Sequence, residues 1–238
     1  MQKTVFHFMG QRVELWTHWE PDHLATVIRT SRGFYETDVL LKCREIYIPG
    51  TVVIDAGANI GNHTVFFAGI LGAKVEAIEP FPANYDVIRM NVVANGLERR
   101  VRTHCLALGE REGRGVAAIG HENNLGTVSV RSGGSTGDIP IATLDSIAAD
   151  LPVGLIKIDV EGGEAGVLAG ASRTLRRWLP DIMVEADGTT QFEGTARQLL
   201  EFGYAVRGRY AWTPTYLFSA IDQGARMHSL LERTAVMA

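Results

Sequence analysis

The sequence has only two cysteines in 238 residues, Cys43 and Cys105, and they do not form a CxxC motif. Their scarcity excludes a disulfide framework and gives no support to a structural zinc site. No apolar run approaches the roughly 18 residues that a membrane-spanning helix needs, so we expect no membrane span. The opening residues, MQKTVFHFMGQRVELW, lack the apolar core of a signal peptide. We therefore expect a cytoplasmic protein.

An excess of charge of one sign is also missing. Lys and Arg number 23, Asp and Glu number 27, and the formal net charge is −4. Charge alone therefore gives no reason to expect a nucleic-acid partner. Hydrophobic residues make up 46% of the chain and charged residues 21%, values typical of a globular protein. This composition excludes a disordered, collagen-like or mainly coiled-coil chain. The length suits one large domain or two small ones.

From residue 51 onward, short β-branched runs alternate with helical patterns. Such alternation predicts an α/β fold, with a mostly parallel sheet and helices on both of its faces. The predicted strands are 51–55, 74–79, 101–108, 155–160 and 181–185, with a terminal pair at 204–209 and 216–220. The predicted helices are 62–71, 84–93, 164–179 and 195–202.

Two segments depart from this alternation. Residues 1–49 hold Trp16, Trp19, Phe34 and Tyr35 among polar residues. We interpret them as an N-terminal extension that is either packed on the edge of the domain or acts as a lid over it. The main domain then spans 50–238, with a β-rich insertion at about 113–141. The Gly- and Ser-rich stretch 131–138 reads as a loop.

The most informative stretch follows the first predicted strand and opens a helix. It has the pattern D-x-G-x-N-x-G, formed by Asp55, Gly57, Asn59 and Gly61. Glycines let the backbone approach a ligand, and ligands of open α/β sheets bind at this edge. Glu79 ends the second strand, 24 residues after Asp55. An acid there can accept hydrogen bonds from both ribose hydroxyls of a nucleotide-like cofactor.

The same turn discriminates between cofactors. Asn59 stands where a dinucleotide fingerprint has its second glycine, which disfavours a nicotinamide-dependent oxidoreductase, and the G-x-x-x-x-G-K-[ST] phosphate loop is absent. An acid before a glycine turn suits a cofactor with a cationic amino-acid end. S-adenosylmethionine (SAM) fits that description, with Asp55 holding its ammonium directly or through water.

Carboxylates gather where the fourth and fifth strands end. Asp159, Glu161 and Glu164 follow the fourth strand, and Glu185 and Asp187 follow the fifth. They can serve as a general base, hold a sugar through hydrogen bonds, or bind a divalent cation. Glu164 can instead simply cap a helix N-terminus. The histidines show no H-x-E or H-x-x-x-H ligand pattern, so we expect no catalytic metal.

Three stretches together resemble the FkbM family of SAM-dependent methyltransferases. They are VVIDAGANIGNHTVFFA, EAIEPFPANYDVIRMNVVANGL and LIKIDVEGGEAGVLAGASRTL, and the resemblance runs from about residue 34 to 187. It implies a Rossmann-like class I methyltransferase core of seven strands, in the order 3-2-1-4-5-7-6 with the last strand antiparallel. It also implies O-methylation of a hydroxyl on a sugar, glycan or natural product.

The resemblance also assigns roles to individual residues. Glu36 is expected to reach the acceptor, although it can also be an exposed acid at a helix start, and Asn123 and Asn124 can also be a hairpin turn. Glu185 completes the expected acceptor site. The expected cofactor-binding residues are Asp55, Gly57, Asn59, Gly61, Glu79, Leu106, Ala107 and Asp159.

Methyl transfer to a hydroxyl benefits from a base that takes the departing proton. We expect Asp159 or Glu161 in this role, with a pKa raised by neighbouring carboxylates. If the fourth strand continues through both residues, their side chains share a face. His63 is a secondary candidate, which the helix macrodipole would keep neutral. It can equally bond a neighbouring backbone carbonyl.

Three alternatives remain besides O-methylation: an N-methyltransferase, a C-methyltransferase and a noncatalytic SAM-binding domain. Nucleobase N-methylation usually shows an N/D-P-P-Y/F motif after the fourth strand, where this chain has IDVEG. We expect a small-molecule or glycan acceptor. The sequence leaves the acceptor's identity and the oligomeric state open.

Overall fold

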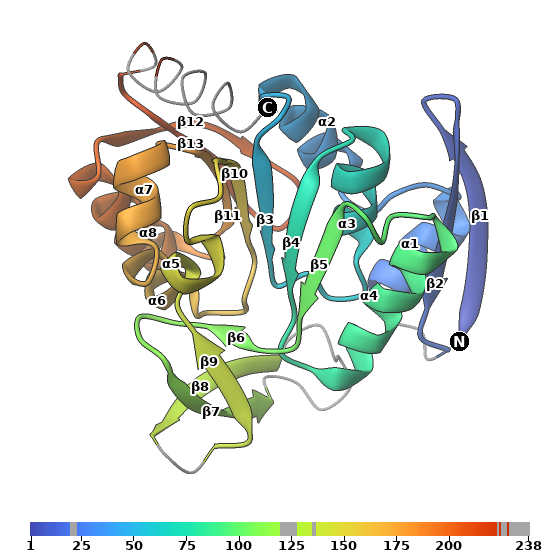
Figure 1. Ribbon diagram of the computed structural model, residues 1–238, viewed down its shortest axis with the longest axis horizontal. Helices are drawn as coiled ribbons and strands as arrows, with labels where there is room; N and C mark the ends of the chain where they lie inside the picture. The colour runs from blue at the N-terminus through green and yellow to red at the C-terminus, as the bar shows by residue number, and fades with distance from the viewer. Residues whose placement is uncertain (20–22, 120–127, 135–136, 223, 225–227, 229–238) are drawn as a thin grey trace.

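The computed structural model describes residues 1–19, 23–119, 128–134, 137–222, 224 and 228 (Figure 1). Its centre is a seven-stranded sheet in the order β12-β13-β11-β10-β3-β4-β5. β13 runs antiparallel to the other six strands of this sheet. Counted along the chain, these strands have the order 3-2-1-4-5-7-6, so the predicted fold and topology are confirmed. The strands are β3 (Val52–Ala56), β4 (Lys74–Ile78), β5 (Val101–His104), β10 (Val153–Ile158), β11 (Asp181–Glu185), β12 (Tyr204–Tyr210) and β13 (Thr215–Ala220).

Helices cover both faces of this sheet, as its two-sided burial requires. Successive residues of a strand point to opposite faces, so Val53 packs in one apolar cluster and Ile54 in the other. The first cluster lies under α1 (His23–Ser31), α2 (Thr37–Ile46), α3 (Asn62–Val65), the π-helical turn Phe66–Ile70 and α4 (Pro82–Ala94). The second lies under α5 (Leu144–Ala148), α6 (Glu164–Ala169), α7 (Ser172–Trp178) and α8 (Thr189–Glu201). Figure 1 shows the two groups on opposite sides of the sheet.

The single helix predicted over 164–179 is wrong, because the chain breaks between α6 and α7 at Gly170. A Cβ on Gly170 would lie 2.1 Å from the carbonyl oxygen of Gly109. The Gly170 carbonyl accepts a hydrogen bond from the Asp145 N–H at 2.9 Å. Asp145 in turn accepts from the backbone N–H groups of Arg173 and Thr174, at 2.9 and 2.7 Å. The break therefore lets Asp145 cap α7.

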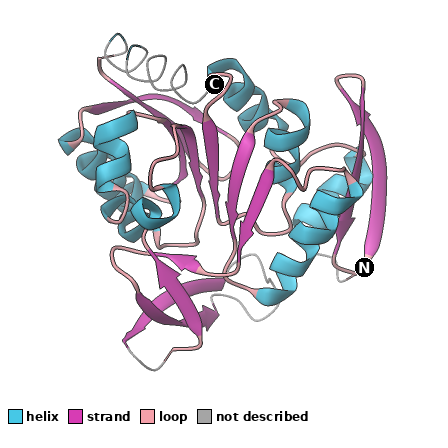
Figure 2. Cartoon of the chain, in the orientation of Figure 1, coloured by secondary structure: helices cyan, strands magenta, loops and turns pink. Residues whose placement is uncertain are grey.

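A second, four-stranded sheet occupies the stretch where we expected the insertion. Its order is β6-β9-β7-β8, and Figure 2 shows it below the central sheet. The predicted strand 101–108 is therefore divided, with its end in this second sheet. The loop predicted over 131–138 is wrong for 131–134, because pairing with β7 places them in β8. The strands are β6 (Ala107–Leu108), β7 (Gly113–Ile119), β8 (Val128–Gly134) and β9 (Ile139–Ala142).

The chain begins with a hairpin of β1 (Gln2–Phe8) and β2 (Gln11–Thr17), which two asparagines fasten to α4. The Asn91 amide accepts from the Trp16 N–H at 2.6 Å and donates to the Trp16 carbonyl at 3.0 Å. Asn95 binds the N–H and carbonyl of Glu14 at 3.0 and 2.7 Å. Four residues of helix rise about 6 Å and two residues of strand about 6.6 Å, so the spacings match. The amides therefore pair with the outer edge of β2.

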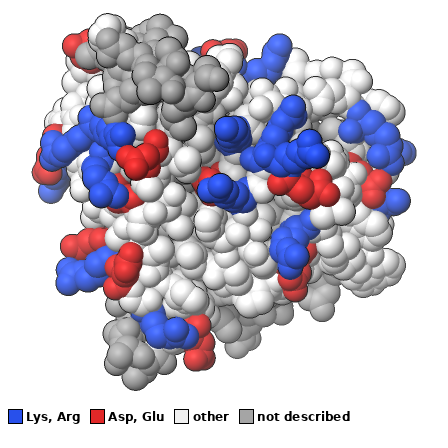
Figure 3. Space-filling model, viewed as in Figure 1, with Lys and Arg blue, Asp and Glu red and all other residues white. Residues whose placement is uncertain are grey.

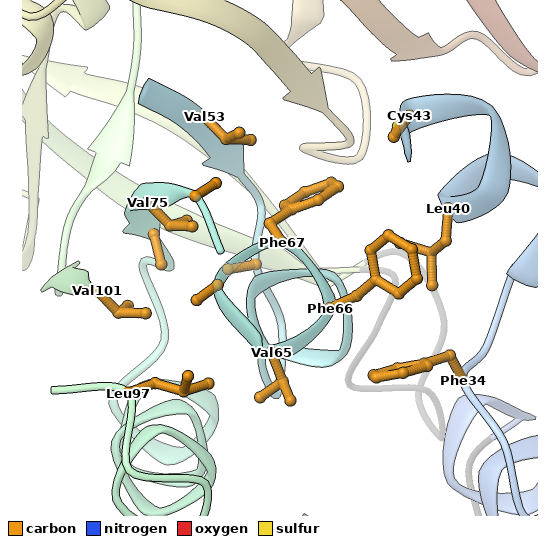
Figure 4. Close-up of a cluster of buried hydrophobic side chains, with 14 of the residues drawn as sticks. Phe34, Leu40, Cys43, Val53, Val65, Phe66, Phe67, Val75, Leu97 and Val101 are labelled. Carbon is orange, nitrogen blue, oxygen red and sulfur yellow. The ribbon is translucent and has the colours of Figure 1, made fainter. Parts of the chain in front are cut away.

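Aromatic rings join the N-terminal segment to the core of the domain. The Phe34 ring lies 5.2 Å from Phe6 and 5.4 Å from Phe66, both edge to face. Figure 4 shows Phe34, Leu40 and Cys43 beside Phe66 and Phe67. All five are at most 3% exposed and belong to one cluster with residues of the central sheet. The hairpin, α1, Phe34 and α2 thus contribute side chains to the sheet's own core.

The surface carries charges of both signs. On the face in Figure 3, basic and acidic side chains of the described residues are interspersed among uncharged ones. Within the described ranges, no helix has the length and apolar character required to cross a bilayer.

Replacing Asn91 with alanine should lower the free energy of unfolding by about 2–3 kcal/mol, because buried backbone groups of Trp16 and Ile60 lose their partner. Chemical denaturation measures this change. The matched control is Val93→Ala on the same helix, where the side chain is 62% exposed. That control should change stability by no more than about 0.5 kcal/mol. Equal stabilities for the two variants would contradict the fastening role of Asn91.

Candidate active site

A pocket opens where β3, β4 and β10 end, the edge at which open α/β sheets bind ligands. It includes six of the eight expected cofactor-binding residues, and Glu161 as well. Asp55 and Gly61 are not among its lining residues. The pocket is lined by Gly57, Asn59, Ile78, Glu79, Pro80, Phe81, Asn84, Leu106, Ala107, Leu108, Val130, Asp159, Val160, Glu161 and Gly163.

Gly57 lies at the tightest point of this edge. Its φ of 77° is in the left-handed region, and an added Cβ would lie only 1.7 Å from the carbonyl oxygen of Asp159. The Gly57 N–H donates to the Ile78 carbonyl at 3.0 Å. A side chain here would push the ends of β3 and β10 apart and fill the space beside the pocket. Only glycine fits this position.

Glu79 is nearly buried and holds the turn through both of its carboxylate oxygens. The Asn59 N–H donates to Oε2 at 2.9 Å, and the Phe81 N–H donates to Oε1 at 3.1 Å. Burial raises the pKa of Glu79 to about 7, although these backbone donors oppose the shift. The Asn84 side chain also hydrogen-bonds this carboxylate, so three of its roughly four acceptor sites are occupied and one stays open to a ligand hydroxyl. Asn59 contributes to this arrangement through its backbone, with a left-handed φ of 51°.

Asp55 lies beneath the turn and does not line the pocket. It has no exposed surface, and its Oδ2 accepts a hydrogen bond from the Thr64 hydroxyl at 2.5 Å. Its Oδ1 lies 3.6 Å from the Lys157 ammonium. This placement favours a supporting role over the expected direct contact with a ligand. Gly61 is also buried, and it closes the turn by donating its N–H to the Ala58 carbonyl at 2.8 Å.

Lys157 is the central residue that sequence reasoning left without a role. It is 4% exposed, and its ammonium donates to the Gly57 carbonyl at 2.8 Å. It also lies 3.3 Å from Asp159 Oδ2. Burial disfavours its charge, but the carboxylates of Asp159, Asp55 and Glu36 outweigh this effect and raise its pKa. The available signal was a lysine inside the apolar run LIKIDV, since buried lysines are rare unless they are paired.

Asp159 and Glu185 form a hydrogen-bonded pair of carboxyl groups. Burial raises the pKa of Glu185 to about 10, and the charge of Asp159 adds to the shift. Burial acts in the same direction on Asp159, but Lys157 and the Glu185 bond reverse it and lower the pKa of Asp159. Asp159 is therefore ionised near neutral pH, while Glu185 is protonated and donates.

Glu161 lies beyond the end of β10, and its φ is 57°. The predicted shared strand face of Asp159 and Glu161 is therefore wrong. Buried Glu164 bends the chain here, because its Oε1 accepts hydrogen bonds from the Val160 and Gly162 N–H groups at 3.3 and 3.0 Å. The exposed Glu161 side chain still lines the pocket. Partial desolvation by the surrounding atoms, followed by repulsion from Asp159 and Glu164, raises its pKa to about 7.

Glu36 and His63 meet beside this cluster, with 3.4 Å between Glu36 Oε2 and His63 Nε2. Glu36 is not an exposed acid, because its side chain is only 11% exposed. Burial, followed by Asp159, raises its pKa to about 7. Burial and the charge of Lys157 lower the pKa of His63 to about 4, so the ring is neutral as expected. The physical cause differs from the expected macrodipole.

Tyr35 brings the N-terminal segment to the cluster. The Asn62 amide accepts from the Tyr35 N–H at 3.0 Å and donates to the Tyr35 carbonyl at 3.1 Å. Burial, followed by the charges of Glu36, Glu185 and Asp159, raises the pKa of the Tyr35 phenol. This shared influence places the phenol near all three carboxyl groups. A tyrosine adjoining Glu36 was the sequence signal for it.

Asn123 and Asn124, which the resemblance assigned to the acceptor, lie outside the described residues. Among the residues whose positions are described, no group of three or more His, Cys, Asp or Glu is arranged to hold a metal ion.

The Glu185→Gln variant should lose less thermal stability than the wild type as the pH rises from 7.5 to 9.5. Glu185 has a folded-state pKa of about 10 against an ordinary value of 4.5, so folding retains a proton that the unfolded chain has released. The stability from that proton is lost as the pH rises toward 10. The other shifted glutamates titrate near 7, below this window.

Circular dichroism melts at pH 7.5, 8.5 and 9.5 test this prediction. Glutamine still donates a hydrogen bond to Asp159, so the variant changes ionisation and keeps the bond. Exposed Glu193→Gln on α8 is the matched control and should melt as the wild type does at each pH. Parallel pH dependence in wild type and Glu185→Gln would refute the protonated state assigned to Glu185.

Comparison with known proteins identifies the family. The family model for the methyltransferase FkbM domain matches residues 55–223. "Methyltransferase 1" of Beauveria bassiana (strain ARSEF 2860) is 26% identical over an alignment of 203 residues, and the match covers 73% of this chain and 81% of that protein. The pocket lies within the part of the chain that the family model covers.

Solved structures agree in fold. The methyltransferase FkbM of Methylobacillus flagellatus KT superposes with a TM-score of 0.53 at 18% identity, covering 83% of this chain and 60% of that one. This chain thus spans three fifths of that relative's length. Precorrin-6y C5,15-methyltransferase of Geobacter metallireducens GS-15 gives a TM-score of 0.50 at 15% identity, covering 77% and 87%. Since the family model covers most of the chain, this protein belongs to the FkbM family of methyltransferases, with SAM as its cofactor.

Proposed function

We propose that this protein is an O-methyltransferase that acts on a hydroxyl of a sugar, glycan or natural product. The observation that carries the proposal is Glu161, a carboxylate at the pocket with a pKa raised to about 7. A hydroxyl acceptor must lose its proton during methyl transfer, and a general base is most effective when its pKa lies near the working pH. The cytoplasmic location and the absence of a nucleic-acid partner stay predictions.

Several residues that line the pocket suit particular groups of the SAM molecule. Glu79 keeps acceptor capacity for a ribose hydroxyl, and Leu106 and Ala107 offer apolar surface for the adenine. Gly57 lines the pocket and lets the ends of β3 and β10 lie close together beside it. The ionised Asp159 is a suitable partner for the ammonium of the amino-acid end. When bound, SAM supplies a methyl group activated by its attachment to a sulfonium.

The chain's own residues provide orientation and proton transfer. Glu161 takes the proton from the acceptor hydroxyl, because its pKa makes it the more basic of the two candidates. Lys157 and Glu185 hold Asp159 ionised and fixed in direction. Glu36 and Glu185 face the acceptor side and bind its other hydroxyls. His63, with a pKa of about 4, is too weak a base for this step and supports Glu36.

Replacing Glu79 with alanine should weaken the binding of SAM and S-adenosylhomocysteine by about 1–3 kcal/mol, since the ribose hydroxyls lose a charged acceptor. Isothermal titration with S-adenosylhomocysteine measures the change, with a thermal melt to verify that the variant is folded. Exposed Glu193→Gln is the control and should bind as the wild type does. Unchanged affinity in a folded Glu79→Ala protein would sink this assignment of the ribose site.

Replacing Glu161 with glutamine should lower kcat by about 10²-fold, or roughly 2.7 kcal/mol, because the amide keeps the shape but has no basicity. Affinity for SAM should stay near that of the wild type. Transfer of a tritiated methyl group, first screened over glycans and hydroxylated natural products, supplies the assay. EDTA should leave the rate unchanged, because we propose no metal. Wild-type turnover in Glu161→Gln would show that another group, or positioning alone, performs this role.

A further inference from the structure

Trp212 is the most exposed large hydrophobic side chain of the described residues. Its exposed fraction is 98%, against 1% for the buried Trp178. Exposing a tryptophan leaves its large apolar surface in water, and aromatic residues that recognise a partner combine such surface with little flexibility. The residues around the turn that carries Trp212 indicate which kind of ligand this side chain can contact.

The turn between β12 and β13, residues 211–214, lies at the acceptor side of the site. The Ala211 N–H donates to Asp38 Oδ2 at 2.8 Å, two residues after Glu36. The Pro214 carbonyl accepts from the Ala186 N–H at 2.9 Å, one residue after Glu185. The turn therefore spans the gap between the two carboxyl residues that we assign to the acceptor.

The backbone of this turn is held on both sides of Trp212. Thr215 pairs with Glu185 in the sheet, and Tyr210 and Ala211 pack against the core. The Tyr210 hydroxyl bonds with Lys42 of α2. The backbone of the turn is therefore fixed, and both faces of the exposed indole are open to a ligand.

The chemistry on either side of the indole restricts the ligand. Glu36 and Glu185 can donate and accept hydrogen bonds when protonated and accept them when ionised, which suits hydroxyl groups. Acidic groups outnumber Lys157, whose ammonium is already bound by Asp55 and Asp159, so an anionic acceptor is disfavoured. An indole face is electron-rich and attracts weakly positive C–H groups. The ligand that combines hydroxyls at its edge with a C–H face is a sugar ring.

We propose that Trp212 is a stacking platform for a pyranose ring of the acceptor, which it orients with a hydroxyl toward Glu161. This inference rests on the proposed O-methyl transfer, and it narrows the acceptor class to sugars. It assigns the β12–β13 turn to acceptor selection, with no part in binding SAM.

The test compares Trp212→Ala, Trp212→Phe and the matched control Leu200→Ala, an exposed apolar residue of α8. Tryptophan fluorescence is recorded while methyl glycosides of glucose, galactose, mannose and rhamnose are added. Sorbitol, which has hydroxyls but no ring face, is the control ligand. We expect a saturable change with at least one glycoside in wild type and Leu200→Ala, none with sorbitol, and none in Trp212→Ala.

Methyl transfer to the glycoside that binds gives a second readout. Trp212→Ala should raise KM about tenfold and leave kcat nearly unchanged, and Trp212→Phe should restore KM to within about threefold. A wild-type KM in Trp212→Ala, or no fluorescence change with any of the four glycosides, overturns the inference. Titration with S-adenosylhomocysteine separates the two proposals. If the wild type does not bind S-adenosylhomocysteine, the proposed function is refuted. If it does bind and Trp212→Ala keeps the wild-type KM, only the stacking role of Trp212 is refuted.

Discussion

The site depends on one buried cation, the ammonium of Lys157. It donates to the Gly57 carbonyl and lies within 3.3 to 3.6 Å of the carboxylates of Asp159 and Asp55. A buried charge is tolerated only when it is paired, so these three groups must converge on it. That convergence draws the ends of β3 and β10 together, and a Cβ at Gly57 would then collide with Asp159. The D-x-G and K-x-D motifs are therefore one structural unit, although they lie 100 residues apart.

The same lysine determines which acids are ionised. Its charge favours the anion of Asp159, whereas burial, followed by that anion, disfavours a negative charge on Glu36, Glu161 and Glu185. Asp159 thus keeps its charge, Glu185 is protonated, and Glu36 and Glu161 titrate near pH 7. This division produces an anion suited to a cationic cofactor group, and acids suited to hydroxyl groups and proton transfer.

Features with a local signal could be predicted from the sequence. The strand–helix alternation predicted the mostly parallel sheet, the family resemblance implied its strand order, and the glycine turn with Glu79 predicted one wall of the pocket. Features that depend on distant partners could not be predicted. In the sequence, Lys157 looks like a charged residue that interrupts an apolar strand, because its partners at the end of β3 are far away along the chain. Asn91 reads as an ordinary helix residue and Asn95 as the end of that helix, because their partners in β2 lie 75 and 81 residues away. The break at Gly170 depends on a contact with Gly109.

The cofactor part and the proposed acceptor part of the site are formed by different kinds of segments. The cofactor end comes from turns that directly follow neighbouring parallel strands, so its residues occur in short motifs. The acceptor end that we propose joins Glu36, which precedes the part matched by the family model, to Glu185 and the β12–β13 turn. Asn62 holds the segment of Glu36 in place through hydrogen bonds to the backbone of Tyr35. Asp38 accepts a hydrogen bond from the β12–β13 turn. Because this end is assembled from both ends of the chain, a change in either segment can alter acceptor choice while the cofactor site stays the same. Short sequence motifs therefore indicate the binding site of the methyl donor, whereas the proposed acceptor site depends on tertiary contacts between distant segments.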